Sequence, residues 1–374
     1  MKTFETDIGF GYNEHNVFMD NMLNLSLPDV LHYDWPHCYF INGIFNREMD
    51  AFMELMTPRG YGPRTLHAYL AAWKWPKAYA SGALVCVKNS VGGSMSEVLS
   101  SVLVIRKFVL DIIVPTGIYK KAVASMLCLL HVLDMLLHAQ RGILDVGDLE
   151  KKIMQHLTAQ QAAYGTSIWI PKCHFTLHLG KWYELFGFLL NTLVLERRHK
   201  VVKAAIKNKE NTISFERNSL EEMVVQHLHD LSMMPSVQSF GLWKQQPPTN
   251  KMLEVLSACG LDVTQPNDIY TSMDAIIACR HVMAGDVVIF AAGIDAVSVG
   301  KVYFHYSVQD TCYTCMAPWR FVAANDTEVS YEVLDNIRLC PLAHLKDSII
   351  YSIAGVGQIS HCLLSVAHSH FVFK

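Results

Sequence analysis

The run Gln245-Gln246-Pro247-Pro248-Thr249-Asn250 divides the chain of 374 residues into two parts of different character. A polar, proline-rich run is typical of a linker, because proline lacks a backbone donor and interrupts helices and sheets. Before it, apolar residues recur at three- and four-residue spacing, which predicts helices. After it, Val287-Val288-Ile289-Phe290 and Val302-Tyr303-Phe304-His305-Tyr306 predict strands. We therefore expect an α+β fold, mostly helical in its N-terminal two-thirds, with a small, β-rich and barrel-like C-terminal domain.

Several helices are expected in the first part. A clear amphipathic pattern runs from Pro36 to Met56. Two strongly apolar helices are expected at about 95–113 and 118–139, and a third at about 146–163. The Gly-containing segment that precedes them, 90–93, is expected to be a surface loop.

Two further helix starts are expected later in the first part. Pro171 favours the beginning of a helix, and a long helix is then expected to run through Glu196. The segment Ser219-Leu220-Glu221-Glu222 has the form of a capping box, which predicts a helix start just before Met223.

The composition excludes several classes of protein. Hydrophobic residues make up 51% of the chain, too many for a disordered protein. The 31 Lys and Arg against 34 Asp and Glu give a net charge of −3, so any contact with DNA has to be local. The 10 cysteines lack the spacing of a disulfide framework and the N-terminus lacks a secretory pattern, so we expect an intracellular protein that is not secreted. The apolar stretch Ala122 to Ala139 contains His131 and Asp134, which favours a buried helix and no membrane partner.

The segment Leu31-His32-Tyr33-Asp34-Trp35-Pro36-His37 contains the first candidate site residues. Asp34 and His37 are three positions apart, so on a helix they share a face and could both point into a metal-bearing cleft. The alternative is a structural role. Asp34 is a favourable N-cap with Pro36 in the first turn, and His37 would be a hydrogen-bonded histidine on the apolar stripe of the helix.

The most basic stretch of the chain begins at Glu196. Glu196, Lys200 and Lys203 are separated by steps of four and three, which places a carboxylate and cations on one helical stripe. Such a stripe can follow a phosphate backbone. The alternative is a solvated helix in which Glu196 and Lys200 form an ordinary ion pair. The candidate nucleic-acid-binding residues are Arg197, Arg198, His199, Lys200, Lys203, Lys207 and Lys209.

Two smaller groups of metal-ligating residue types occur in the sequence. His174 and His178 are four positions apart, a spacing that can supply two metal ligands from one helix face, with Cys173 as a third. No second ligand pair is evident, so a structural role is the favoured alternative. Cys312 and Cys315 form a lone C-x-x-C in a predicted strand, where structural cysteines are the expectation.

Two groups of motifs together resemble a known family. The D-x-x-H segment at Asp34 is similar to a motif of CACTA-like (En/Spm-type) DNA transposases. A later series of motifs has the order seen in the same family. This series is Pro171-Lys172-Cys173-His174, His178-Leu179, Gly187, Glu196-Arg197-Arg198-His199-Lys200, Lys203, Ser219 and Glu221-Glu222. The resemblance implies part of an RNase H-like core with a helical insertion, followed by a β-rich accessory domain, in a nuclear protein derived from a mobile element.

The resemblance also implies domain boundaries and site residues. The catalytic residues would be Asp34, His37 and Glu196. Mg²⁺ or Mn²⁺ would be held by Asp34 and Glu196, with Asp20 as a further candidate carboxylate. The domains would be 1–90 (partial core with D-x-x-H), 91–165 (helical insertion), 166–240 (C-terminal helical part of the core), 241–270 (linker) and 271–374 (accessory domain).

One departure from the family limits what the chain can do alone. Strand transfer by this fold needs three carboxylates around two divalent ions about 4 Å apart. No residue stands where the first catalytic Asp is expected, well upstream of Asp34. The resemblance therefore implies a DNA-binding remnant of a strand-transfer enzyme that is inactive alone. Another transposase polypeptide would have to complete the site, and if the site is not completed no metal cofactor is expected. Whether the chain is an enzyme or a pseudoenzyme stays open.

Two other functions are compatible with the sequence. The chain could be a non-enzymatic protein-interaction module like a chromatin reader, because small reader barrels bind through aromatic side chains at one rim. Tyr303, Tyr306, Tyr313 and Trp319 could form such a rim, although these residue types more often fill a core. The other alternative is a decayed mobile-element reading frame without function.

Overall fold

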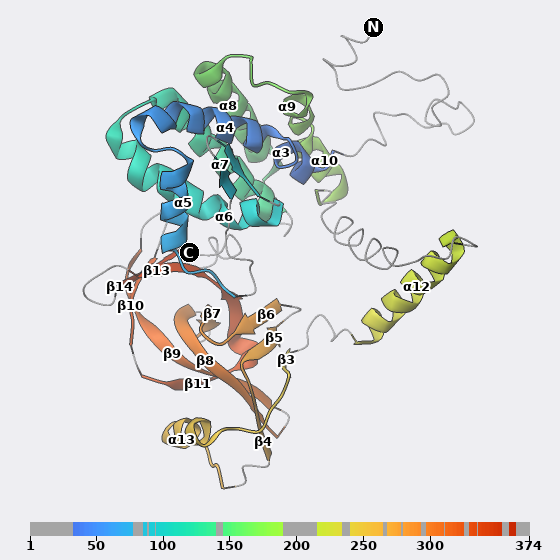
Figure 1. The fold of residues 1–374 in the computed structure, drawn as a ribbon, viewed down its shortest axis with the longest axis vertical. Helices are drawn as coiled ribbons and strands as arrows, with labels where there is room; N and C mark the ends of the chain where they lie inside the picture. The colour runs from blue at the N-terminus through green and yellow to red at the C-terminus, as the bar shows by residue number, and fades with distance from the viewer. Residues whose placement is uncertain are drawn as a thin grey trace. The chain divides into compact units, whose positions relative to one another are not determined.

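The computed structural model describes most of the chain and divides it into two compact units. The described residues are 33–77, 85–87, 90–93, 95–139, 145–189, 215–233, 240–264, 268–277, 280–292, 297–309, 311–324, 329–334, 336–353 and 359–363. Those within Met1–Ala68 and Leu84–Ala204 form a helical unit, and those within Tyr69–Ala83 and Ala205–Lys374 form a unit rich in antiparallel strands, here called the β unit (Figure 1). The fold class is α+β, as expected.

The amphipathic pattern from Pro36 to Met56 forms two helices instead of the single helix that was expected. They are α3 (Trp35–Tyr39) and α4 (Ile44–Met56). Asn42, between them, has a φ of 47°, in the left-handed region. A Cβ at Gly43 would overlap the backbone of α3. The tight turn at these two residues therefore breaks the helix, although the apolar stripe continues across the break.

The long apolar helices lie close to their predicted positions. α6 (Met95–Phe108) continues into a π-helical turn, Val109–Ile113, and is followed by α7 (Lys120–Ala139). α8 (Val146–Tyr164) starts at Asp145, whose carboxylate accepts a hydrogen bond from the Asp148 amide at 2.9 Å. The described residues contain no helix with the length and apolar character needed to cross a membrane. The remaining described helical segments of this part are Thr57–Arg59 (3₁₀), α5 (Pro63–Ala72) and Val114–Thr116 (3₁₀).

The segment at 90–93, expected to be a surface loop, forms half of a hairpin. β1 (Val85–Val87) pairs with β2 (Ser90–Gly92) in antiparallel register. Val91 is buried and β2 packs against α4. The two glycines of the segment suggested a loop, but the hydrophobic Val91 just before them supplies the buried contact of a short strand.

The later helices also differ in part from the expectations. α9 (Pro171–Thr176) begins at Pro171, as predicted, and α10 (Leu179–Phe186) follows it. α10 ends at Gly187, which adopts a left-handed φ of 71° and donates its amide to Tyr183 O, so no single helix runs on through Glu196. α12 (Phe215–Met233) already includes Ser219, so the capping-box pattern does not mark its start.

The β unit is built on one large antiparallel sheet. Among the described strands its order is β12-β7-β8-β9-β10-β14-β13, with β4 on β8 and β11 on β9. A small second sheet has the order β3-β5-β6. The large sheet comprises β4 (Ile269–Ser272), β7 (Val287–Ala291), β8 (Val297–Val308), β9 (Thr311–Ala324), β10 (Val329–Glu332), β11 (Arg338–Pro341), β12 (Leu345–Ser348), β13 (Ile350–Ile353) and β14 (Ile359–Leu363). The small sheet comprises β3 (Phe240–Trp243), β5 (Asp274–Ile277) and β6 (Arg280–Met283), and a 3₁₀ turn spans Leu342–His344. The stretch 241–270 was expected to be a linker. It instead contains most of β3, α13 (Asn250–Ala258) and the start of β4.

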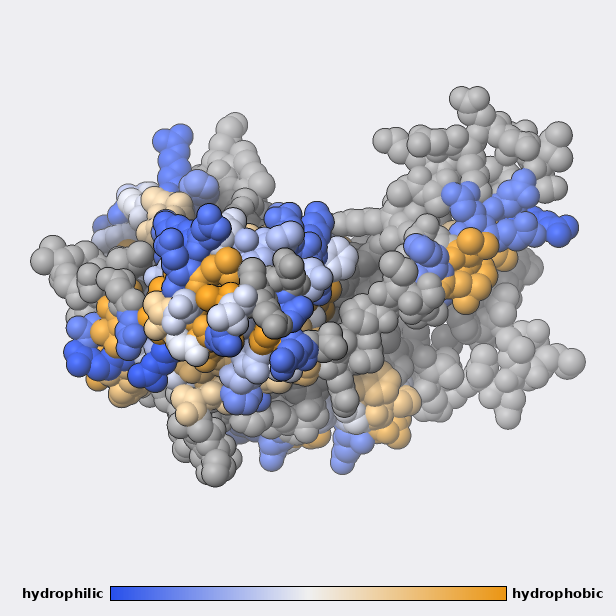
Figure 2. Space-filling model, turned by 90° about the horizontal axis from the view of Figure 1, so that it is seen from below, coloured by the Kyte–Doolittle hydropathy of each residue, from blue (hydrophilic) through white to orange (hydrophobic). Residues whose placement is uncertain are grey.

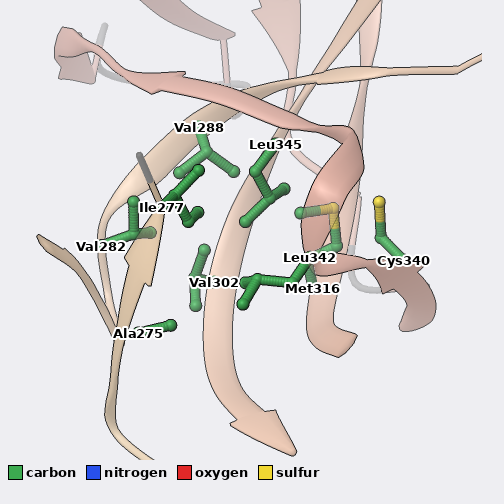
Figure 3. Packing of buried hydrophobic residues seen from close by; sticks show 9 residues of the cluster. All are labelled: Ala275, Ile277, Val282, Val288, Val302, Met316, Cys340, Leu342 and Leu345. Atoms are coloured by element: carbon green, nitrogen blue, oxygen red, sulfur yellow. The ribbon is translucent and has the colours of Figure 1, made fainter. Parts of the chain in front are cut away.

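The core of the β unit lies between strands of both sheets. Figure 3 shows side chains of β5 and β6 meeting those of β7, β8, β9, β11 and β12, and of the 3₁₀ turn between the last two. Burying a Val, Leu, Ile or Met side chain stabilises a fold by about 1.5–3 kcal/mol. Of the aromatic residues considered for a binding rim, Tyr306 and Trp319 are buried, Tyr313 stacks on Tyr306, and Tyr303 is 37% exposed. The nine residues of the cluster are Ala275, Ile277, Val282, Val288, Val302, Met316, Cys340, Leu342 and Leu345.

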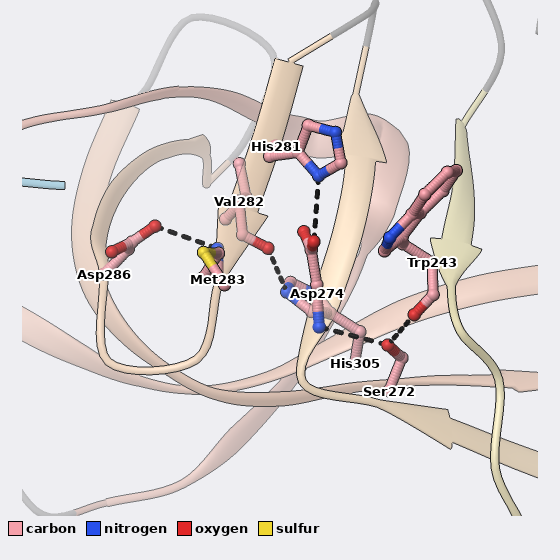
Figure 4. Close-up of polar contacts among 8 residues, drawn as sticks. All are labelled: Trp243, Ser272, Asp274, His281, Val282, Met283, Asp286 and His305. Carbon is pink, nitrogen blue, oxygen red and sulfur yellow. Dashed lines mark hydrogen bonds and ion pairs between the residues drawn. The ribbon is translucent and has the colours of Figure 1, made fainter. Parts of the chain in front are cut away.

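A segment from early in the chain completes the β unit. Lys74 exchanges two backbone hydrogen bonds with Tyr351 of β13, at 2.7 and 3.1 Å. The Lys77 amide donates to Oδ1 of Asp286 at 2.9 Å. The Met283 amide donates to Oδ2 at 2.8 Å (Figure 4). Asp286 is 2% exposed, and burial raises the pKa of its carboxyl although the two amides oppose the shift. This segment, 69–77, is here called the strap.

Candidate functional site

The D-x-x-H motif lies at the start of α3. Asp34 occupies the N-cap position but makes no capping bond from its side chain. Its Oδ2 instead pairs with Nδ1 of His37. The Asp34 side chain is 12% exposed and that of His37 36%, so the pair lies at the edge of the helical unit and not in its core. A carboxylate that orients an imidazole in this way is an arrangement used in proton transfer and around metal ligands.

The Pro171-Lys172-Cys173-His174 segment packs against α3. Lys172 Nζ donates to His37 O at 2.9 Å and also to Ile41 O, across 135 positions of sequence in the first case. The His37 carbonyl lies in the last turn of α3 and the Ile41 carbonyl just beyond it, at the helix end where a cation is favourable. Burial lowers the pKa of Lys172, while the nearby Cys38 and Asp34 oppose the shift. Folding therefore brings the two motif groups together at one lysine.

Aromatic stacking joins the same two segments. The Tyr33 ring stacks on Phe175 with centroids 4.8 Å apart, and on His178 at 5.5 Å. Stacked rings at such distances stabilise a contact beyond their buried area. The sequence interpretation missed Tyr33 and Phe175 as site residues. The one available signal was that each of them lies next to a motif residue, Asp34 or His174.

The other predicted site residues lie outside the described residues. These are Glu196 and Asp20, together with Arg197, Arg198, His199, Lys200, Lys203, Lys207 and Lys209. The structure thus brings Asp34 and His37 together and gives no position for the remaining carboxylates or for the basic stretch. Within the described part of the chain, no three or more His, Cys, Asp or Glu side chains are grouped so that they could hold a metal ion.

A buried polar network links the helices of the same unit. Glu48 of α4 is fully buried and accepts hydrogen bonds from Ser125 Oγ at 2.6 Å and from Gln160 Nε2 at 2.9 Å. Nε2 of the fully buried His156 lies 2.7 Å from the same carboxylate. Cys173 Sγ lies 4.0 Å from Gln160 Oε1. Cys173 is 2% exposed, so it belongs to the packed interior, and burial raises the pKa of its thiol.

The β unit carries a second polar cluster, on its small sheet. Oδ2 of Asp274 lies 2.8 Å from Nδ1 of His281, and Oδ1 of Asp274 is buried without a hydrogen-bond partner among the described residues (Figure 4). The Trp243 ring lies edge-on to His281 with centroids 5.6 Å apart, and Trp243 is 45% exposed. We name these three residues the Trp243 cluster. No motif in the sequence indicated it.

Exposed apolar residues are spread over the surface of the β unit. Figure 2 shows a face on which hydrophobic patches alternate with hydrophilic ones. Besides Trp243, Tyr270 is 45% and Met273 55% exposed. Scattered apolar residues are normal on a protein surface, so a specific contact has to be argued from their neighbours.

Comparisons with models of protein families, with curated protein sequences and with solved structures found no match to this chain.

Proposed function

We propose that this chain is a transposase-derived DNA-binding protein, the remnant of a metal-dependent DNA strand-transfer enzyme that is inactive alone. One observation supports this proposal above the others. The two motif groups that resemble CACTA-like transposases lie far apart in sequence yet touch through Lys172 on His37 O and through Tyr33 on Phe175. An ancestral active site that drew on both motif groups would require such proximity.

The finer parts of the proposal follow from the same resemblance. The helical unit would correspond to part of an RNase H-like core with an insertion at 91–165, and the β unit to a barrel-like accessory domain. Asp34 would supply one carboxylate for Mg²⁺ or Mn²⁺, together with Glu196 and Asp20. When bound, such an ion supplies charge stabilisation to phosphodiester chemistry. A second transposase polypeptide in the nucleus would have to provide the missing carboxylate.

DNA binding would be local because the chain as a whole is slightly acidic, with a net charge of −3. The basic stretch from Arg197 to Lys209 is the segment with the charge density to contact phosphates. Phosphate contacts hold DNA without reading its sequence. We therefore expect affinity for many duplexes and a strong dependence on salt.

The test is fluorescence anisotropy of labelled duplex DNA with the full chain at several salt concentrations. The variant Arg198→Gln/Lys200→Gln/Lys203→Gln should bind more weakly. Its slope of log affinity against log salt should be shallower by about 0.9 for each lost phosphate contact. The matched control removes three exposed lysines elsewhere, Lys121→Gln/Lys151→Gln/Lys251→Gln. Equal losses in both variants, or no salt-dependent binding by the parent chain, would exclude this function.

A second candidate function is recognition of a protein partner by the β unit, which the Trp243 cluster favours. An exposed tryptophan face beside a carboxylate suits a cationic side chain, through cation–π and ionic attraction. We expect Trp243→Ala to weaken binding of lysine- or arginine-rich peptides in a fluorescence titration. Trp169→Ala is the matched control because Trp169 is 42% exposed in the helical unit. Peptide binding that is indifferent to Trp243 would argue against this candidate.

A further inference from the structure

Two histidines of the helical unit present the same ring nitrogen to each other. His174, on α9, is exposed, and His178 occupies the N-cap position of α10. Their Nε2 atoms are 3.2 Å apart, and their rings meet edge to face with centroids 4.9 Å apart. The turn between the helices keeps nearly helical spacing, because the His178 amide donates to Phe175 O at 3.2 Å. The backbone therefore holds both imidazoles on one side.

We propose that His174 and His178 form a surface site for a divalent transition-metal ion that prefers imidazole, such as Zn²⁺, Ni²⁺ or Cu²⁺. Two nitrogens bound to one tetrahedral Zn²⁺ through bonds of about 2.0–2.1 Å lie about 3.3 Å apart. The observed 3.2 Å is close to this separation. The two nitrogens, which share a hydrogen bond in this structure, therefore already lie at the separation that the ion requires.

The surroundings of the pair hold one of its rings in place. Tyr33 stacks on His178 with an interplanar angle of 21°, which restricts rotation of that imidazole. A ring that is already held loses less rotational freedom when it binds an ion, and this favours binding.

The site is open and separate from the proposed strand-transfer chemistry. Cys173 points into the packed interior toward Gln160, so two imidazoles are the protein ligands that the described residues provide. Water or a donor from another molecule would complete the coordination shell. The ion class also differs, because Mg²⁺ and Mn²⁺ prefer carboxylate oxygens whereas this pair offers nitrogen. The inference thus goes beyond the proposed function and does not depend on it.

The first measurement is calorimetric titration of the untagged full chain with ZnCl₂ and with NiCl₂. We expect His174→Ala and His178→Ala each to lower the affinity of one site by at least about tenfold, since each removes one of two ligands. His227→Ala is the matched control because His227 is exposed on α12. Asp34→Asn should leave the affinity of the histidine site unchanged, because it alters the proposed carboxylate site and not this one. Unchanged affinity and stoichiometry in the double variant His174→Ala/His178→Ala would overturn the inference.

A second measurement needs no variant. Diethyl pyrocarbonate modifies accessible neutral histidines, and peptide mass spectrometry locates each adduct. Zn²⁺ should slow modification of His174 and His178 in the parent chain and leave His227 unchanged. If Zn²⁺ leaves the modification rates of His174 and His178 unchanged, as at His227, the pair holds no ion.

Discussion

At the scale of a single residue, His305 shows how burial fixes a protonation state. Its Nε2 lies 2.9 Å from Val282 O and its Nδ1 lies 2.8 Å from Thr314 Oγ1. A carbonyl can only accept, so Nε2 carries the proton and Nδ1 accepts from the threonine hydroxyl. Burial lowers the pKa of this histidine to about 4, and the hydrogen bond to Val282 O only partly opposes the shift. The β unit therefore contains a neutral histidine across the physiological pH range.

This protonation state predicts acid sensitivity. In the unfolded chain His305 gains its proton near pH 6.5, but in the folded chain only near pH 4. Stability from this group is therefore present above about pH 6.5 and is lost as pH falls toward 4, by roughly 3 kcal/mol in total. Urea unfolding from pH 7 to 4.5 should show a smaller loss in His305→Gln than in the parent chain. His344→Gln, at an exposed position, should keep the full loss.

The pairing of Asp34 with His37 follows from their spacing, and the sequence indicated it. A spacing of three positions places two side chains on one helix face whatever surrounds the helix. The contacts of Lys172 and Tyr33 with the other motif could not be predicted in this way. They depend on how α9 packs on α3, which no local pattern records. The sequence pattern also did not indicate the buried network of Glu48, because a charged residue within an apolar stripe is not expected to be buried.

At the scale of the element, the Glu48 network holds the helices in register. It joins α4 to Ser125 of α7 and to His156 and Gln160 of α8. A buried carboxylate tolerates this position because three donors surround it. Any slip of one helix by a turn would separate the donors from the acceptor and leave polar groups unsatisfied.

Glu48→Ala should destabilise the helical unit by about 3–5 kcal/mol, since it leaves three buried polar groups without their acceptor. Thermal or urea unfolding measured by circular dichroism at 222 nm would show the loss. Glu54→Ala, at an exposed position on the same helix, should change stability by less than about 0.5 kcal/mol. Similar losses in the two variants would mean that the network is not what stabilises the packing.

The sequence predicted elements wherever the periodic pattern was long and unbroken. α6, α7, α8, β7 and β8 lie close to the expected positions, because their burial repeats over several turns or along one strand. Two of the errors occurred at residues that change the backbone direction. Asn42 with Gly43 breaks the first helix and Gly187 ends α10, in each case while the apolar pattern still favours continuation.

At the scale of the whole molecule, the strap makes the β unit depend on two distant parts of the chain. Lys77 and Asp286 are 209 positions apart. Asp286 is the link, because its two oxygens accept from the Lys77 amide of the strap and from the Met283 amide at the end of β6. A contact at that separation leaves no trace in local composition, so the sequence predicted only the C-terminal part of the unit.

Asp286→Ala should release the strap while leaving the helical unit unaffected. Hydrogen exchange of the Lys77 and Met283 amides should become at least about tenfold faster, because a lost hydrogen bond of about 1.5–3 kcal/mol to a charged acceptor no longer protects them. Asp262→Ala is the control, since Asp262 is exposed and accepts a hydrogen bond from the nearby Thr264 amide. Unchanged protection at Lys77 would show that the backbone pairing of Lys74 is sufficient to hold the strap.

The strap has a further consequence for the order in which the protein is made. A ribosome adds roughly 5–20 residues per second. The 209 positions between Lys77 and Asp286 therefore correspond to a delay of about 10–40 s at that rate. When the strap leaves the ribosome, the strands that it pairs with have not yet been synthesised. The rest of the helical unit is made in this interval. During translation, synthesis of the β unit thus starts before the helical unit is complete and ends after it.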